Sequence, residues 1–202
     1  MKYSFLPINK YCIKEYCLVP LREEDMELIM KWRNEQIDVL RQKKPLTKDQ
    51  QHSYFNQVVV KSFSDDKPDC ILFSFLINYV CVGYGGLVHI DWKSKTAELS
   101  FLVDTNRYTD KNLYKSDYNS FLTLISKIVF EELKFKKLFA ETYDIRPYHI
   151  EILEKFGFKE EKRIKNSVEI NGKMFVLCSM CMKILVNQNE NVQYIFITKI
   201  GF

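Results

Sequence analysis

The sequence predicts a mixed α/β fold in which helices flank one central sheet. Apolar runs typical of strands alternate with segments of helical periodicity, in the order strand, helix, helix, three strands, helix, strand, helix, hairpin. A chain of 202 residues is most often one domain, and 47% hydrophobic with 28% charged residues is typical of a soluble globular protein. We therefore expect a single domain over residues 1–185, followed by a tail or an extra strand over residues 186–202.

Composition narrows the possible partners and location. No apolar run approaches the roughly 20 residues that span a bilayer, and the N-terminus lacks the apolar core of a signal peptide. The formal charge of +4 comes from scattered basic residues, which predicts neither nucleic-acid nor membrane binding. Six cysteines without an export signal favour reduced thiols in the cytoplasm. Cys178 and Cys181 are an odd number of residues apart in a predicted strand, so we expect no metal site there.

The N-terminal part of the chain is predicted to hold one strand and two helices. Residues 11–21 carry β-prone residues and form the strand. A helix then opens at Arg22, with acidic residues in its first turn, where they complement the helix dipole. Thr47 is in position to cap a second helix that begins at Lys48. Residues 62–69 are polar and contain a proline, which predicts a loop.

Three consecutive strands and a long helix are predicted in the middle of the chain. The strands cover residues 70–79, 80–91 and 96–104, and the helix follows a polar run over residues 105–112. Glycines in the second strand indicate a bulge or a close approach of another backbone; they are Gly83, Gly85 and Gly86.

A β-hairpin is predicted near the C-terminus. Residues 160–170 and 174–184 have strand-like composition, and Asn171-Gly172 between them is a strong turn signal. Residues 193–202 are predicted as a last strand or a loosely held tail.

The stretch between the long helix and this hairpin carries the most specific pattern. Residues 137–140 form a buried strand, Pro147 suits the first turn of a helix, and a glycine follows the last apolar position of that helix. Together with Lys155-Phe156-Gly157-Phe158, this order resembles the C-terminal half of the GNAT-type N-acetyltransferases. Arg146 stands where that family has an Asn, and Leu153 where it has a Tyr. An ordinary strand–helix unit with a glycine cap is the alternative.

The resemblance covers roughly residues 11–184 and implies a fold and an activity. The implied GNAT fold has a mixed, mostly antiparallel sheet of about seven strands flanked by about four helices, with its fourth and fifth strands splayed apart. The implied reaction is transfer of an acetyl group from acetyl-CoA to an amine, with no metal. Acetyl-CoA would lie between the strands at residues 96–104 and 137–144.

The family's glycine-rich phosphate-binding loop is missing. Such loops work because successive backbone N–H groups at a helix N-terminus bind an anion. This chain has no glycine between Gly86 and Gly157. The polar run is either a solvated loop, with weakened CoA binding, or a source of side-chain donors. The cofactor-binding candidates are Leu102, Val103, Arg107, Lys111, Asn112 and Arg146.

Glu98 is the leading candidate for the general base. It lies opposite the apolar side of its strand, where the family often places a carboxylate, and a surface glutamate is the alternative. The family's usual tyrosine acid is replaced by Leu153. Residues near the start of the last helix can substitute for it; they are Tyr143, Tyr148 and His149.

The acceptor is predicted from the triplet Trp32-Arg33-Asn34. This triplet, followed by Arg41 and His52, resembles the pattern of GNAT enzymes that acetylate nucleotide-linked amino sugars. The chemistry is suitable, because Trp offers a face for stacking and Arg can bind a phosphate. A core Trp32 beside a solvated Arg33 is the alternative. The substrate-binding candidates are Trp32, Arg33, Asn34, Arg41, His52 and Glu141, the last also an acid–base option.

Two other functions stay open at this stage. The layout also resembles ribosomal-protein N-terminal acetyltransferases, and the missing glycines and tyrosine are compatible with a binding module without activity. The expected partner is a small-molecule amine, and a homo-oligomer is among the possible assemblies.

Overall fold

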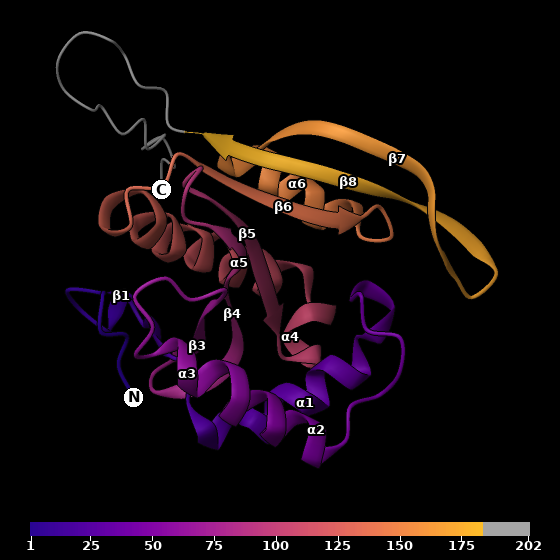
Figure 1. The fold of residues 1–202 in the computed structure, drawn as a ribbon. Coiled ribbons are helices and arrows are strands. Elements are labelled where there is room, and N and C mark those ends of the chain that lie inside the picture. Colours follow the sequence, from indigo (N-terminus) through magenta and orange to yellow (C-terminus); the bar gives the residue numbers. More distant parts are fainter. Residues whose placement is uncertain (184–202) are drawn as a thin grey trace, which may run out of the picture.

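The computed structural model describes residues 1–183 and joins its strands into one eight-stranded sheet (Figure 1). The strands are β1 (Tyr11–Ile13), β2 (Tyr16–Pro20), β3 (Ile71–Ile77), β4 (Val80–Asp91), β5 (Thr96–Val103), β6 (Lys137–Tyr143), β7 (Lys159–Ile170) and β8 (Lys173–Lys183). Their order is β1-β2-β3-β4-β5-β6-β8-β7, and only the β5–β6 pair is parallel. The predicted mixed, mostly antiparallel sheet is confirmed. The tail or strand expected over residues 186–202 lies outside the described residues.

The α-helices lie on both faces of the sheet. They are α1 (Met26–Glu35), α2 (Lys48–Tyr54), α3 (Val60–Ser62), α4 (Thr105–Thr109), α5 (Lys111–Ser126) and α6 (Pro147–Phe156). Single turns of 3₁₀-helix precede and follow α1 at Glu23–Asp25 and Ile37–Val39, and π-helical segments extend α2 and α5 at Phe55–Val59 and Lys127–Glu132. Figure 1 shows α1 and α2 on one side of the molecule, and α6 beside β6 and β8 on the other.

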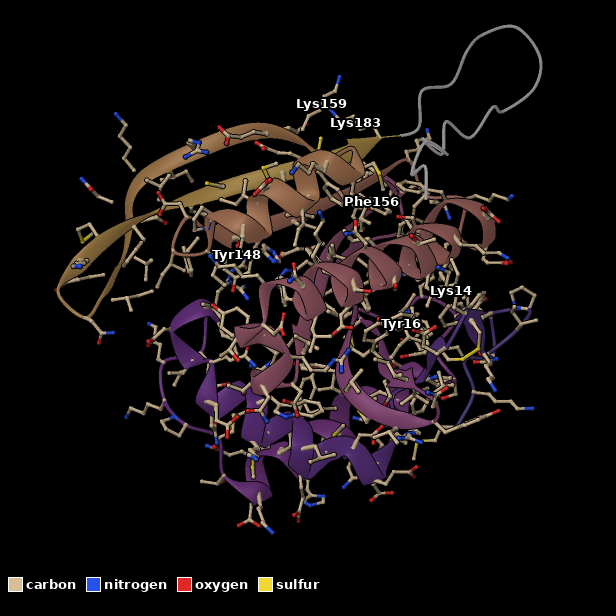
Figure 2. All side chains as sticks on the ribbon, turned by 180° about the vertical axis from the view of Figure 1, so that it is seen from behind. Lys14, Tyr16, Tyr148, Phe156, Lys159 and Lys183 are labelled. Atoms are coloured by element: carbon tan, nitrogen blue, oxygen red, sulfur yellow. A yellow bond between two sulfur atoms is a disulfide. The ribbon has the colours of Figure 1, made fainter. Side chains whose placement is uncertain are left out.

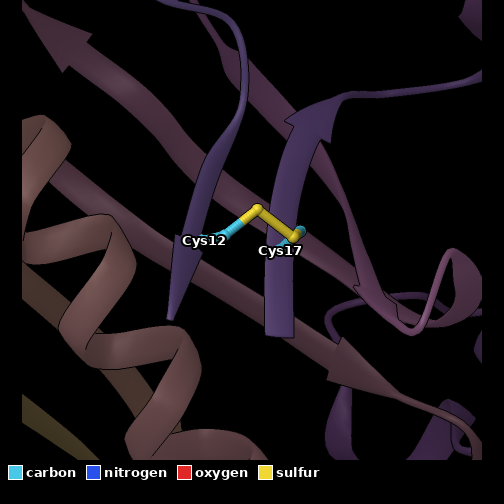
Figure 3. Close-up of a disulfide and its surroundings, with 2 residues drawn as sticks. All are labelled: Cys12 and Cys17. Carbon is cyan, nitrogen blue, oxygen red and sulfur yellow. A yellow bond between two sulfur atoms is a disulfide. The ribbon is translucent and has the colours of Figure 1, made fainter. Parts of the chain in front are cut away.

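The expected single strand over residues 11–21 is wrong. The chain turns at Lys14, whose φ is 52°, and forms the β1–β2 hairpin. Cys12 and Cys17 face each other across this hairpin and are joined by a disulfide (Figure 3). On one continuous strand, residues five apart would point to opposite faces, but the turn at Lys14 places Cys12 and Cys17 opposite each other. The expectation that all the cysteines are reduced is therefore corrected for this pair. Cys178 and Cys181 are free and buried.

Two helix starts show how local chemistry sets the fold. At α2, Thr47 accepts from the Gln50 N–H at 3.3 Å while the Gln50 side chain accepts from the Thr47 N–H at 3.0 Å. This capping box confirms the predicted start. The polar run at residues 105–112, in contrast, is not a plain loop, because Asp104 caps the short helix α4 there. Short helices are hard to predict because few residues carry the signal.

The glycines of β4 allow close backbone packing, as predicted. A Cβ built on Gly85 would lie 2.3 Å from the Ser100 carbonyl oxygen, and one on Gly86 would lie 2.0 Å from that of Ile71. Gly86 also has a φ of 150°, a backbone angle that residues other than glycine rarely adopt. Glycine at these positions therefore lets β3 and β5 approach β4.

β5 and β6 pair over a short distance and then separate. The pairing joins Thr96 to Lys137, Ala97 to Leu138 and Glu98 to Phe139, whereas β5 continues to Val103. β5 therefore has backbone beyond Glu98 without a partner in β6. This confirms the predicted separation of the fourth and fifth strands. These two strands are β5 and β6 in the structure, because the expected first strand is divided into β1 and β2.

The end of the described chain is the long β7–β8 hairpin, whose tip projects beyond the rest of the sheet (Figure 1). Asn171 and Gly172 form its turn with φ values of 51° and 74°, as a type I′ turn requires. The described part of the chain contains no helix long and apolar enough to cross a membrane.

Candidate active site

The two faces of β5 serve different purposes. Phe101 packs on α5, with ring centroids 4.8 Å from Tyr118 and 4.5 Å from Phe121. Glu98 is three residues away and, because side chains alternate along a strand, points to the opposite face. There it is 7% exposed, which corrects the alternative of an exposed surface glutamate.

A compact charged cluster surrounds the Glu98 carboxylate. Arg41 Nη2 donates to Glu98 Oε1 at 2.9 Å and also to Glu141 Oε2. His89 Nδ1 lies 2.7 Å from Glu98 Oε2. We call these four residues the Glu98 cluster. It holds two carboxylates against one guanidinium, and the Arg41 side chain is 47% exposed. The structure thus brings together three of the predicted site residues.

His89 is the member of this cluster that the sequence did not predict. It sits in β4 where the pairing with β5 shifts register between Val88 and Asp91, and its φ is 47°. That bulge turns the imidazole onto Glu98 while leaving the side chain 65% exposed. A lone histidine near the end of a strand gives little signal in a sequence, because bulges depend on the pairing partner.

The Trp32-Arg33-Asn34 triplet holds structure together around the cluster. Trp32 is 2% exposed and its indole N–H donates to Asp104 Oδ2 at 3.0 Å, so the expected stacking face is buried. Arg33 donates to the Tyr84 hydroxyl and to Gln42. The Asn34 side chain accepts from the Leu46 N–H at 2.7 Å and from the Gln42 amide. Arg33 and Asn34 therefore anchor the loop that carries Arg41.

Two other candidates contribute less. His52 is exposed on α2, near Glu27 of α1. Tyr143 is half-buried at the end of β6, two residues beyond Glu141 and therefore on the same face of the strand.

His149 lies on the opposite side of the sheet from the Glu98 cluster. It is 6% exposed, stacks on Tyr118 at a centroid distance of 4.6 Å, and has Nδ1 2.6 Å from the Tyr114 hydroxyl. Burial, followed by the nearby Arg146 cation, holds the pKa of His149 well below its usual value. His149 is therefore a neutral, packed histidine, and no contact links it to Glu98.

This buried histidine should make the fold sensitive to acid. Below about pH 6.5 the unfolded chain protonates His149 and the folded chain does not. The contribution of His149 to the free energy of unfolding is therefore fully present above that pH, and it falls by up to about 1.4 kcal/mol per pH unit below it. Urea unfolding between pH 7.5 and 5 measures this slope. His149→Gln should reduce the slope, while His52→Gln, at an exposed position, should keep it. Equal slopes in all three proteins would contradict this assignment.

The expected phosphate-binding side chains are arranged differently from the prediction. Arg107 makes a two-pronged ion pair with Asp117, which is 0% exposed, through Nε at 2.6 Å and Nη2 at 2.7 Å. The first N–H groups of α5, from Asn112 and Leu113, are capped by the Asp110 carboxylate at 2.9 and 3.1 Å. Lys111 is exposed, with Nζ 5.9 Å from the centre of the Tyr148 ring. Arg107 and the amides of Asn112 and Leu113 therefore already have a carboxylate partner.

Two features do fit an extended, anionic cofactor. Leu102 and Val103 lie in the part of β5 that has separated from β6, although the Val103 carbonyl already accepts from Gln36 at 2.8 Å. Arg146, at the start of α6, is 6% exposed, and its Nε has no hydrogen-bond partner. Tyr148, the next candidate along, is half-buried at the same end of α6 (Figure 2).

A cavity of about 800 Å³ lies elsewhere, beside the β1–β2 hairpin, with Lys10, Cys17 and Tyr79 in its lining. None of the predicted site residues lines it. Over residues 1–183, moreover, no group of three or more His, Cys, Asp or Glu side chains is placed to hold a metal ion. The separation of β5 and β6 and the Glu98 cluster define the candidate site.

Solved structures with the same fold are acetyltransferases. Spermidine N-acetyltransferase from Vibrio cholerae, solved in complex with CoA and spermine, matches with a TM-score of 0.71 and 17% identity over 84% of this chain and 95% of that chain. Mutant forms of the spermidine/spermine N-acetyltransferase SpeG from the same organism match with a TM-score of 0.69 and 17% identity, over 84% and 94%. A protein described as a putative acetyltransferase matches with a TM-score of 0.65 and 11% identity, over 87% of both chains.

Sequence comparison places the chain in a family. No curated protein matches it. Residues 18–177, however, match the family model described as an acetyltransferase (GNAT) domain, and this range holds the Glu98 cluster, the separated strands and α6. The chain therefore belongs to the GNAT family of N-acetyltransferases.

Proposed function

We propose that this enzyme transfers an acetyl group from acetyl-CoA to the primary amine of a small cationic molecule at the Glu98 cluster. One observation carries the choice of acceptor: two carboxylates, Glu98 and Glu141, share a single cation supplied by the half-exposed Arg41. A polyamine presents the same kind of cation to this face. When it binds, Arg41 moves outward and the substrate ammonium takes its place.

The separated strands support acetyl-CoA as donor, because unpaired strand backbone can hydrogen-bond the amides of an extended ligand. When bound, acetyl-CoA supplies an activated acetyl thioester. The enzyme's own task is to place the amine and to remove its proton. Binding the amine beside these strands converts a bimolecular encounter into a reaction between held groups.

Glu98 is proposed to take the amine's proton. An alkylammonium with a pKa near 10 is almost wholly protonated at neutral pH and must be deprotonated to act as a nucleophile. Glu98 is buried, and its Oε2 contacts His89, whose side chain is largely exposed. His89 then passes the proton to solvent, and the hydrogen bond to Glu98 orients its ring.

A nucleotide-linked amino sugar is the second candidate acceptor. The half-exposed Arg41 side chain favours it, because Arg binds phosphate groups well. The predicted stacking of a nucleotide base on Trp32 does not support this acceptor, because Trp32 is buried. A protein N-terminus is a further alternative acceptor. The alternative to an enzyme is a binding module without activity. Cytoplasmic location, a single domain and homo-oligomer formation remain proposals from the sequence.

Two measurements test this function. Acetyl-CoA at 100 times its Kd should stabilise the protein by about 2.7 kcal/mol, seen as a rise in Tm. A panel of polyamines, nucleotide-linked amino sugars and peptides with free N-termini should release thiol from acetyl-CoA with the polyamines. Turnover of only sugars or only peptides would overturn the acceptor assignment. Stabilisation by acetyl-CoA without any turnover, or neither effect, would favour the module without activity.

A further inference from the structure

Arg146 is a buried cation without an anionic partner among the described residues. The residue is 6% exposed, its Nε makes no hydrogen bond, and its side chain forms no ion pair with any residue between 1 and 183. It lies near the Tyr108 ring, with the guanidinium carbon 5.4 Å from the ring centre. Burying a charge without a counter-charge is costly, so such groups are usually paired. Arg107, 24% exposed, shows the ordinary solution in its pair with Asp117.

The surroundings of Arg146 are aromatic and uncharged. Four tyrosines from α4, α5 and α6 contact one another with ring centroids 5.5 to 6.1 Å apart; this tyrosine cluster is Tyr108, Tyr114, Tyr118 and Tyr148 (Tyr148 is labelled in Figure 2). Burial raises the pKa of Tyr114 to about 12, and also raises the pKa values of Tyr118 and Tyr148. The hydroxyls of these three tyrosines therefore stay neutral and cannot balance the guanidinium.

The remaining titratable neighbours do not balance it either. The pKa of His149 is lowered by burial and then by Arg146, so the imidazole is neutral too. The Asp117 carboxylate, which acts on Tyr114, is committed to Arg107 and to the Tyr16 hydroxyl. The region between α4, α5 and α6 thus holds a buried positive charge with no counter-charge among residues 1–183. It also holds tyrosine hydroxyls, two of which contact His149.

Guanidinium and hydroxyl groups together are suited to a phosphate group. We propose that Arg146 and the tyrosine cluster bind a phosphate group of acetyl-CoA, in place of the helix amides that Asp110 already caps. This inference rests on the proposed function, because it takes acetyl-CoA as the ligand. The missing glycines then have a physical explanation. A side chain just before α6 supplies the anion site, so no close approach of a phosphate to the start of α5 is needed.

Calorimetry with CoA, dephospho-CoA and pantetheine on intact wild type and Arg146→Gln tests the proposal. The substitution should weaken CoA binding by about 10- to 100-fold, as expected for lost charge-assisted hydrogen bonds, and should leave pantetheine binding unchanged. A loss that persists with dephospho-CoA assigns the site to the pyrophosphate, and one that disappears assigns it to the 3′-phosphate; both support the proposal. Arg163→Gln, at an exposed arginine paired with Glu160 on β7, is the matched control and should bind CoA like wild type.

A stability readout separates this role from a structural one. Without ligand, Arg146→Gln should have a Tm equal to or above that of wild type, because it removes an uncompensated charge. Arg146→Met and Arg146→Lys provide the same test if Arg146→Gln does not fold. The Arg146→Lys variant should bind CoA with an affinity between those of wild type and Arg146→Gln. Unchanged CoA affinity in all three variants, or equal losses for CoA and pantetheine, would overturn the proposal. Arg146-dependent CoA binding without amine turnover would instead overturn only the proposed function.

Discussion

Glu98→Gln is expected to lower kcat by about 10²- to 10⁴-fold while CoA binding stays at the wild-type level. Glutamine keeps the size of the side chain but cannot accept the proton of the substrate ammonium. CoA binding should be unaffected, because the proposed contacts to CoA come from the separated strands and from Arg146 rather than from this charge. The loss should shrink as pH rises toward 10, where more of the amine is already neutral.

Steady-state kinetics from pH 7 to 10, together with CoA titration, measure these effects. His89→Asn tests the proposed proton route, because asparagine tolerates the positive φ at that position; it should lower kcat less than Glu98→Gln does. His149→Ala is the control on the other face and should change kcat least. If His149→Ala caused the larger loss, the proton would leave through the start of α6. Near-normal rates in all variants would mean that positioning alone drives the reaction.

Arg107→Met should be the most destabilising of the arginine substitutions, lowering the free energy of unfolding by about 3 kcal/mol. It would leave the fully buried Asp117 without its counter-charge. We expect the lower end of the range for a broken buried pair, because Arg107 is 24% exposed and Tyr16 still donates to Asp117 at 3.2 Å. Urea unfolding at pH 7 measures the change.

Arg107→Met/Asp117→Asn is the matched control. It removes both charges and should recover a large part of the lost stability, since an apolar or neutral replacement of a whole pair is often tolerated. The contrast with Arg146→Gln is informative, because that substitution removes an arginine that forms no ion pair within residues 1–183. If Arg107→Met were no less stable than the double variant, Asp117 would not depend on Arg107. Arg107 would then be free to bind phosphate, as its position in the sequence suggested.

Much of the fold could be predicted because its signals are local. Thr47 and Gln50 lie within one helical turn, Pro147 and Gly157 mark the two ends of a single helix, and Asn171-Gly172 forms its own turn. The errors occurred where a signal was short or depended on pairing. The turn at Lys14 divided an expected strand, and the few residues of α4 were expected to be a loop.

The sequence alone determined the order of strands and helices, the GNAT resemblance and the candidates Glu98 and Arg146, because each depends on residue type and spacing along one segment. Only the tertiary structure decided which groups meet. Arg41 reaches Glu98 and Glu141 from positions 57 and 100 residues away, and a bulge brings His89 to the same carboxylate. Arg107 pairs with Asp117, whereas Arg146 is buried and has no anionic partner in the described part of the chain. A sequence shows both arginines as equal cations, whereas burial and long-range contacts give Arg107 a counter-charge and leave Arg146 without one among residues 1–183.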